Sequence, residues 1–230
     1  MAIILYIDTA GEKALIGVSK DNQLLALAEN SQSNTHANFV QVAIADVLAK
    51  SGLDIQQVDA VAVTMGPGSY TGLRVGLSSA KGIAYAIGKP LIGISTLALL
   101  AHHASQHPMV TANKNSIQIF CMIDARRMEV FGAIYKADNT IIVPEQSIVL
   151  DAAYFDNLLV NGPVLCVGNG ATKSKEITNH PNLHFMESSY SIDDFIQLAC
   201  IKMENLDFEN IAYSKPAYLK DFYQIPSTKA

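Results

Sequence analysis

The sequence has few charged residues, few cysteines and no long apolar run. Asp, Glu, Lys and Arg make up 16% of the 230 residues, while apolar residues make up 50% and the mean hydropathy is +0.21. No stretch approaches the roughly 18 apolar residues that a membrane-spanning helix needs, so we expect no membrane contact. The run from Ala2 to Ile7 ends at Asp8 and lacks a basic leader and a cleavage-site pattern, so we expect no signal peptide and a cytoplasmic protein.

The three cysteines, Cys121, Cys166 and Cys200, are far apart, and each lies in an apolar run. This pattern predicts buried, reduced thiols rather than a disulfide, a zinc site or a nucleophile. The net charge of −5 argues against nucleic-acid binding by this chain alone, because such binding depends on lysines and arginines that neutralise phosphates. If RNA is the substrate, another subunit must supply most of the contact.

The distribution of apolar residues predicts two similar α/β units. The first unit is predicted to have strands at 3–7, 14–19, 24–29, 58–64 and 91–94 and helices at about 35–50, 71–87 and 96–103. After the polar segment 104–116 the pattern partly restarts, with strands at 117–123, 129–135, 141–150 and 164–167, helices at 151–159 and 192–205, and a short helix after Gly170. We therefore predict a duplicated fold with lobes at 1–104 and 105–230 and a tail after about 213 that packs back on the first lobe.

The glycine-rich segment 66–76, with the sequence GPGSYTGLRVG, is the most informative motif in the chain. It follows a predicted strand and opens a predicted helix. It resembles the signature of the TsaB (YeaZ) family. Further landmarks of that family follow in order and extend the resemblance over nearly the whole chain: IDTA at 7–10, PLIGISTL at 90–97, IDAR at 123–126, VGNG at 167–170 and PAYL at 216–219.

The resemblance implies an α/β, two-lobed actin-like fold (ASKHA, a duplicated ribonuclease H-like fold), as in sugar kinases. It also implies a non-catalytic partner subunit of the TsaB–TsaD–TsaE complex, which transfers a threonylcarbamoyl group to adenosine 37 of tRNAs that read codons beginning with A. TsaD is the catalytic paralogue and TsaE is an ATPase. We therefore expect a heterodimer with a TsaD homologue, contact with a TsaE homologue, a homodimer when the chain is alone, and tRNA contact only through the complex.

The segment 66–76 is not a Walker phosphate loop, because Gly72-Leu73-Arg74 stands where that motif requires Gly-Lys-Ser/Thr. We interpret it as a tight strand-to-helix turn that needs glycines for its dihedral angles. Backbone N–H groups at the helix start could still hold an anion, and that alternative stays open.

The resemblance also suggests where a nucleotide would lie. Asp8 and Thr9 preserve the first-strand carboxylate segment of actin-like kinases, and Gly168 and Gly170 belong to a loop like their adenosine-side loop. The second phosphate loop, however, is replaced by the bulky segment 124–128, DARRM. We therefore expect weak nucleotide contact at these four residues, no catalytic residue and no cofactor in this chain, with ATP or ADP possible at the interface of the complex. A small-molecule kinase or ATPase of the same fold and a self-sufficient tRNA binder are the alternatives.

His103 and His107 form an HxxxH pattern, which on one helix would place two imidazoles together for a metal ion. In TsaD such a pair follows the strand that corresponds to 91–94, and the matching residues here are Thr96 and Leu100, neither of which is a metal ligand. We interpret the two histidines as solvated and expect no metal site.

Two predicted helices have an unusually uncharged side. Helix 35–50 directs Val40, Ile44 and Val47 to one face, and helix 71–87 directs Leu73, Leu77, Ala80 and Ala84 to one face, as core positions would. Their other faces carry apolar or small residues, which suit either close packing within the monomer or a partner helix. The resemblance favours a pairing surface made of Phe39, Val42, Ala45, Ala49, Gly72, Val75, Ser79, Gly82 and Ala86.

Overall fold

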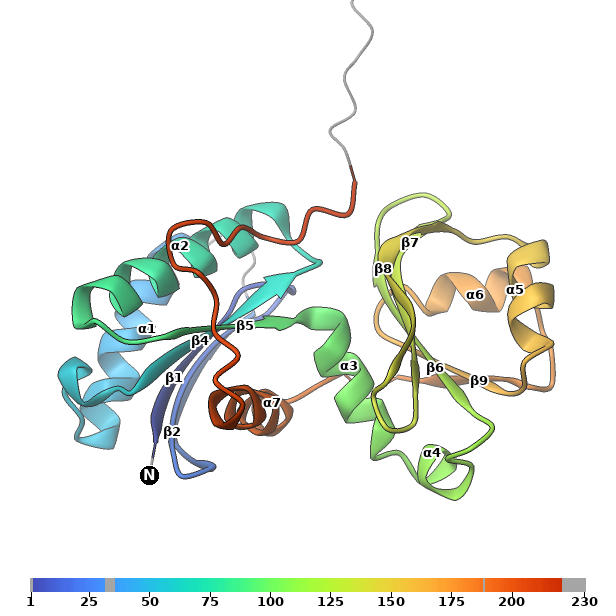
Figure 1. Cartoon of the computed structure of the whole chain (residues 1–230). Helices are drawn as coiled ribbons and strands as arrows, with labels where there is room; N and C mark the ends of the chain where they lie inside the picture. Colours follow the sequence, from blue (N-terminus) through green and yellow to red (C-terminus); the bar gives the residue numbers. More distant parts are fainter. Residues whose placement is uncertain (1, 32–35, 188, 221–230) are drawn as a thin grey trace, which may run out of the picture.

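The computed structural model describes residues 2–31, 36–187 and 189–220, so Thr35, where the predicted helix 35–50 begins, lies outside the described residues. The chain forms two mixed sheets that lie in two lobes (Figure 1). The first sheet has the order β3-β2-β1-β4-β5, and its strands are β1 (Ile3–Asp8), β2 (Ala14–Lys20), β3 (Gln23–Asn30), β4 (Ala60–Gly66) and β5 (Leu91–Ser95). Strands β1, β2 and β3 pair antiparallel, whereas β4 and β5 are parallel to β1.

The second sheet repeats this topology in the order β8-β7-β6-β9-β10. Its strands are β6 (Gln118–Asp124), β7 (Glu129–Lys136), β8 (Ile141–Val149), β9 (Val164–Val167) and β10 (Leu183–Met186). Strands β6, β7 and β8 are antiparallel, and β9 and β10 run parallel to β6. The predicted duplication is therefore confirmed. Strand β10 was not predicted, because four residues flanked by polar segments carry too short a pattern.

Helices cover both faces of each sheet. In the first lobe, α1 (His36–Ser51) and α2 (Tyr70–Ile87) cover one face. The helices α3 (Thr96–Ser105) and α7 (Ile192–Glu204) contact the opposite face, and α3 also packs on the second sheet, so it connects the two lobes. The remaining helices are η2 (Ile55–Gln57), α4 (Pro108–Ala112), α5 (Ala152–Leu159) and α6 (Thr172–Ile177). Helices α5 and α6 pack on the face of the second sheet opposite α3.

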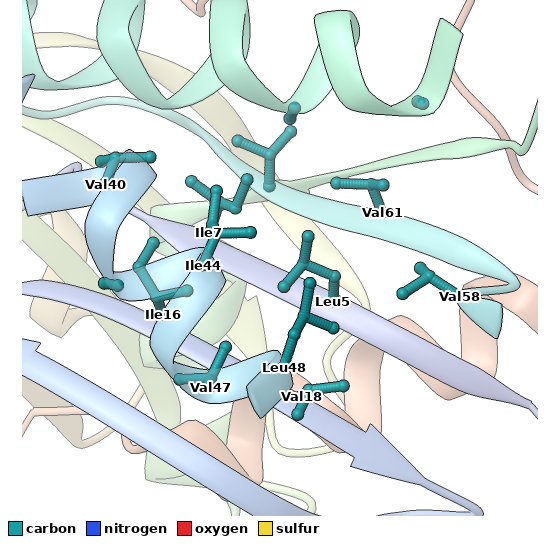
Figure 2. Close-up of a cluster of buried hydrophobic side chains, with 14 of the residues drawn as sticks. Leu5, Ile7, Ile16, Val18, Val40, Ile44, Val47, Leu48, Val58 and Val61 are labelled. Atoms are coloured by element: carbon teal, nitrogen blue, oxygen red, sulfur yellow. The ribbon is translucent and has the colours of Figure 1, made fainter. Parts of the chain in front are cut away.

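The core stripe predicted for α1 is confirmed. Val40, Ile44 and Val47 are buried and point at the first sheet, where they meet Ile7 and Ile16 (Figure 2). On α2 the predicted core residues Leu73, Leu77, Ala80 and Ala84 are likewise buried. Burial of each large aliphatic side chain contributes about 1.5–3 kcal/mol to folding, so both helices are firmly fixed to the sheet by one face.

The glycines of the segment 66–76 allow a close approach between α2 and the end of β1. A Cβ atom on Gly68 would overlap the carbonyl oxygen of Ala10, and one on Gly72 would overlap that of Thr9. Gly76 lies directly against the Thr9 hydroxyl. Only Gly66 of this segment has a positive φ, at 101°. The interpretation that the glycines serve dihedral angles was therefore wrong for three of the four, because they make room for neighbouring backbone and side-chain atoms instead.

The termini of α2 follow the expected capping chemistry. Ser69 precedes the helix, and its side chain accepts a hydrogen bond from the Gly72 backbone N–H. Gly88 ends the helix in the left-handed conformation, with φ 65°, and its N–H bonds back to the Ala84 and Tyr85 carbonyl groups. The Ser69 N–H also donates to the Ala10 carbonyl at 2.7 Å, which fixes the start of the helix on the segment after β1.

The part of the chain after the second sheet returns to the first sheet. Helix α7 places Phe195 and Ile196 against the face opposite α1 and α2. The following segment forms a bridge between Glu209 and Leu91 of β5, and the Ala217 N–H donates to the Met65 carbonyl at 2.8 Å. Division of the chain at residue 104 stays a prediction, and these contacts show that the residues after 191 contribute to the first lobe.

Two further expectations concern cysteines and membrane contact. Cys121 and Cys166 are free and buried, and burial raises the pKa of both thiols, so the prediction of buried thiols is confirmed for them. Cys200 is free and partly exposed. Among the described residues, no helix combines the length and the apolar character needed to cross a membrane.

The glycine contacts predict opposite effects for two alanine substitutions on α2. Gly72→Ala should lower the free energy of unfolding by about 1–3 kcal/mol, because the new methyl group overlaps the Thr9 carbonyl oxygen. Gly82→Ala is the matched control. No atom lies within 4 Å of a Cβ atom there, so alanine should stabilise the helix by up to about 1 kcal/mol. Urea denaturation measures both, and equal stabilities would contradict the close-approach explanation.

Candidate functional site

The exposed sides of α1 and α2 form one continuous surface, which we call the α1–α2 face. The helices lie next to each other, and Gln41 of α1 donates to the Ser79 hydroxyl of α2 at 3.0 Å. Val42 is 70% exposed, and one turn further along α1 Asp46 forms an exposed ion pair with Lys50 at 2.6 Å. The exposed members are Val42, Ala45, Ala49, Gly82 and Ala86, and the half-buried members are Phe39, Val75 and Ser79.

One residue predicted for this face lies elsewhere. Gly72 is buried against Thr9 and serves the packing of the monomer. Phe39 and Val75 reach the surface only in part, because both also pack on the core of the first lobe. The structure thus brings eight of the nine predicted residues to one surface.

The C-terminal segment borders the α1–α2 face on the side away from α1. The Lys81 ammonium donates to the carbonyl of Ser214 at 3.0 Å, and the guanidinium of Arg74 donates to the Tyr218 hydroxyl at 2.9 Å. Tyr85, one turn after Lys81 on α2 and next to Ala86, is 80% exposed, and Tyr213 on the segment itself is 85% exposed. Sequence reasoning did not assign these tyrosines, because the place of Tyr213 depends on contacts more than a hundred residues apart.

A second candidate site is a cleft of about 790 Å³ between the lobes. Its first-lobe wall includes Ser69, Tyr70 and Thr71 at the start of α2, and its second-lobe wall includes the turn after β6. The lining residues are Ala10, Gly11, Glu12, Pro67, Gly68, Ser69, Tyr70, Thr71, Leu73, Ile123, Asp124, Ala125, Arg126, Phe131, Asn169, Ala217, Tyr218, Leu219 and Lys220.

Asp8 and Thr9 do not line this cleft. Asp8 is only 4% exposed, and its carboxylate accepts hydrogen bonds from the Ala10 N–H at 2.9 Å, the Thr64 hydroxyl at 2.8 Å and the Tyr190 hydroxyl at 2.9 Å. Thr9 is fully buried and donates to the Gly72 carbonyl at 2.7 Å. In this arrangement both side chains hold the first lobe together, and nucleotide contact by them stays a prediction.

Gly168 and Gly170 also lie outside the residues that line the cleft. A Cβ atom on Gly168 would overlap the Met122 carbonyl oxygen, and one on Gly170 would press on Val130, so both glycines allow β6 and the loop after β9 to pack closely. Asn169 between them does line the cleft, and its side-chain oxygen accepts the Asp124 N–H at 2.9 Å. Of this sequence motif only the asparagine reaches the cleft, and nucleotide contact by Gly168 and Gly170 stays a prediction.

The segment that replaces the second phosphate loop forms the turn between β6 and β7. Arg126 and Arg127 have φ angles of 67° and 51°, in the left-handed region that non-glycine residues rarely adopt. The turn is closed by a hydrogen bond from the Glu129 N–H to the Arg126 carbonyl at 3.2 Å. Both arginine side chains are exposed, and no glycine N–H faces the cleft from this turn.

The two histidines of the HxxxH pattern lie on different helices. His103 is in α3, and its Nδ1 lies 2.9 Å from Oδ2 of Asp194 on α7, whose carboxylate is almost completely buried. His107 caps the short helix α4, where its Nδ1 accepts the Met109 N–H at 3.3 Å. The interpretation of His103 as solvated was therefore wrong. In the part of the chain that the structure describes, no three His, Cys, Asp or Glu side chains gather as a metal site would require.

The chain matches a known protein family over most of its length. Residues 23–221, most of the chain, match the family model described as "TsaD: tRNA N6-adenosine threonylcarbamoyltransferase". The chain is also 27% identical to the tRNA threonylcarbamoyladenosine biosynthesis protein TsaB of Escherichia coli strain K12 over 95% of its own length and 94% of the relative's. The chain belongs to the TsaD family, in its TsaB (YeaZ) group.

Solved structures agree with the duplicated topology of this TsaB-group chain. YeaZ from Pseudomonas aeruginosa superposes with a TM-score of 0.76 at 21% identity, covering 95% of this chain and all of that one. A polyphosphate/ATP-glucomannokinase from an Arthrobacter strain superposes with a TM-score of 0.51 at 12% identity, covering 90% of this chain and all of that one. The predicted two-lobed actin-like fold is therefore confirmed.

The contact between His103 and Asp194 predicts a structural role for this histidine. His103→Ala should lower the free energy of unfolding by about 1–3 kcal/mol, because it removes a partner of a buried carboxylate that caps α7. A double-mutant cycle with Asp194→Asn, followed by urea denaturation, should show a coupling energy of at least about 0.5 kcal/mol. Additive effects of the two substitutions would show that the contact contributes nothing.

Proposed function

We propose that this TsaB-group chain is a non-catalytic partner subunit in the biosynthesis of threonylcarbamoyladenosine in tRNA. It pairs with a TsaD homologue through the α1–α2 face, supports transfer of the threonylcarbamoyl group to adenosine 37, and works with a TsaE homologue. When alone it forms a homodimer through the same face. Membership of the family supports the pathway, and the composition of this face supports the pairing.

The α1–α2 face is the observation that carries the proposal. A helix side in contact with water usually carries several charged residues, yet beside the Asp46–Lys50 pair of α1 this face exposes Val42, two alanines on α1, and Gly82 and Ala86 on α2. Exposed apolar surface of this kind marks contact with another protein. Small side chains allow the helices of a partner to approach closely, and a glycine with no atom within 4 Å of its Cβ position leaves room for that approach.

The turn after β6 supports the absence of catalysis in this chain. Enzymes of the actin-like fold hold phosphates with glycine loops on both lobes, whereas here the second-lobe position carries Arg126 and Arg127. Asp8, which would act on a nucleotide from the first lobe, already accepts hydrogen bonds from Ala10 and Thr64 of its own lobe and from Tyr190. ATP or ADP binding is therefore proposed only at the interface of the complex.

A small-molecule kinase or ATPase of the same fold is the second candidate, and the cleft between the lobes favours it. The purified chain should not hydrolyse ATP appreciably, with or without Mg²⁺, because one phosphate-binding loop is absent. Turnover at a rate typical of enzymes, on the order of 1–1000 per second, would contradict the partner proposal. A steady-state phosphate-release assay on the isolated chain measures this.

The pairing is tested most sharply by Gly82→Glu. Gly82 is exposed on the α1–α2 face, and glutamate has a higher helix propensity than glycine by several tenths of a kcal/mol. The monomer should therefore fold and melt normally. Within an interface the unpaired charge costs several kcal/mol, and each 1.4 kcal/mol is tenfold in affinity, so homodimer and heterodimer should both be lost. Sedimentation and pull-down with the TsaD homologue measure assembly.

Ala153→Glu is the matched control for this experiment. Ala153 is exposed on α5 in the second lobe, so the same charge is added to a helix far from the α1–α2 face. This variant should assemble like the wild type. Melting temperatures are compared at concentrations where the wild type is monomeric, because dissociation alone lowers apparent stability. Wild-type affinity of Gly82→Glu for the TsaD homologue would show that the interface lies elsewhere.

A further inference from the structure

The turn between β6 and β7 holds two consecutive arginines in an unfavourable backbone conformation. Arg126 and Arg127 have φ angles of 67° and 51°. In this region the Cβ atom crowds the backbone, which is why glycine or asparagine is usually found there. If positions 126 and 127 served only to form a turn, glycine at both would make the protein more stable. The presence of two arginines therefore calls for another explanation.

Surrounding residues fix this turn at several points. The Arg126 N–H donates to Oδ1 of Asp124 at 2.6 Å, and the Asp124 N–H donates to the Asn169 side chain at 2.9 Å. Lys173 donates to the Glu129 carbonyl at 2.8 Å on the other side of the turn. Strained conformations persist where the surroundings over-determine them, and they gather at ligand-binding positions.

Positively charged side chains outnumber negatively charged ones around the turn. Asp124 forms an ion pair with Lys173 at 3.1 Å, and Glu129 forms one with Lys220. Burial raises the pKa of Asp124, but the Arg126 N–H and Lys173 outweigh it, so the pKa is lowered and the carboxylate is charged. Lys220 likewise lowers the pKa of Glu129. The charges of Arg126 and Arg127 also lower the pKa values of Asp124 and Glu129, respectively. Within the described residues neither guanidinium has a hydrogen bond or a close ion pair, and counting Lys173 and Lys220 the four cations exceed the two carboxylates by two charges in a chain of net charge −5.

Aromatic rings line the same cleft. Arg126 lines the cleft together with Tyr70, Phe131 and Tyr218, and Glu12 is the one acidic lining side chain outside the ion pairs just described. Tyr70 and Tyr218 are each 39% exposed, with ring centroids 5.4 Å apart. Guanidinium groups bind phosphates in two-point contacts, and tyrosine rings stack on unpaired bases. This combination fits single-stranded or loop RNA better than a protein partner.

We propose that Arg126 and Arg127 form a phosphate-binding turn through which this chain contacts the RNA substrate directly within the complex. The inference rests on the proposed function, since it requires a complex that acts on tRNA. It also modifies the expectation that RNA contact is left to the other subunits: the acidic chain supplies one local cationic contact, and the partner supplies the rest. Tyr70 and Tyr218 then lie beside the bound backbone, with the Arg74 guanidinium 4.0 Å from the Tyr70 ring centroid.

The test uses the complex of the full chain with its TsaD homologue and an unmodified tRNA transcript as the probe. Arg126→Gln combined with Arg127→Gln should weaken tRNA binding on the order of tenfold, because two charge-assisted contacts are lost. The slope of log affinity against log KCl concentration should fall by about 1.5, as expected for two phosphate contacts. Fluorescence anisotropy over a series of KCl concentrations measures both quantities.

Two further variants keep folding and nonspecific charge effects apart from RNA contact. Lys114→Gln combined with Lys136→Gln removes the same charge from exposed positions of the second lobe outside the cleft, and tRNA affinity should stay within twofold of the wild type. Arg126→Gly combined with Arg127→Gly should weaken tRNA binding as much as the glutamine pair. It should also raise the melting temperature, because glycine relieves the backbone conformation.

The outcomes separate this inference from the proposed function. If the wild-type chain forms no complex with the TsaD homologue in sedimentation, the proposed function fails. If the complex forms and its tRNA affinity and salt slope are unchanged in both arginine variants, the inference alone is overturned. It is also overturned if the arginine variants lose affinity for ATP, measured by calorimetry on the same complex, while tRNA affinity stays at the wild-type value.

Discussion

The close approach of α2 to the end of β1 is the contact on which the other features of the molecule depend. Gly68, Gly72 and Gly76 follow one another at intervals of four residues, and each lies against Thr9 or Ala10. Side chains larger than hydrogen cannot occupy these positions. The distance between α2 and the sheet and the rotation of α2 about its own axis are therefore fixed. Its core face is thereby directed inward, and the side that carries Gly82 is directed to solvent next to α1.

The same contact determines one wall of the cleft between the lobes. The start of α2 faces the turn after β6, and the C-terminal segment bridges the two: Ala217 bonds to Met65 of the first lobe, and Lys220 pairs with Glu129 of the second. The first wall of this cleft is the closely packed start of α2, and the second wall carries the arginine turn. This arrangement is consistent with the proposed role in binding and assembly.

Local patterns predicted most of the fold, whereas contacts distant in sequence decided the rest. Periodicity predicted the duplicated sheets and the buried faces of α1 and α2. It could not show that Gly72 is buried, because the atom it meets belongs to Thr9, 63 residues earlier. The partner of His103 lies 91 residues away. No helix was predicted in the polar segment 104–116, although proline is common at the first position of a helix, as Pro108 is in α4.

Side-chain footprinting with hydroxyl radicals tests the central claim, that the α1–α2 face is where a TsaD homologue binds. Val42 and Tyr85 are 70% and 80% exposed in the monomer, so both should be labelled readily, and Val160 of the second lobe, at 83%, serves as the internal reference. Upon addition of the TsaD homologue, labelling of Val42 and Tyr85 should fall severalfold while that of Val160 stays constant. Complex formation with unchanged labelling of Val42 and Tyr85 would contradict the account.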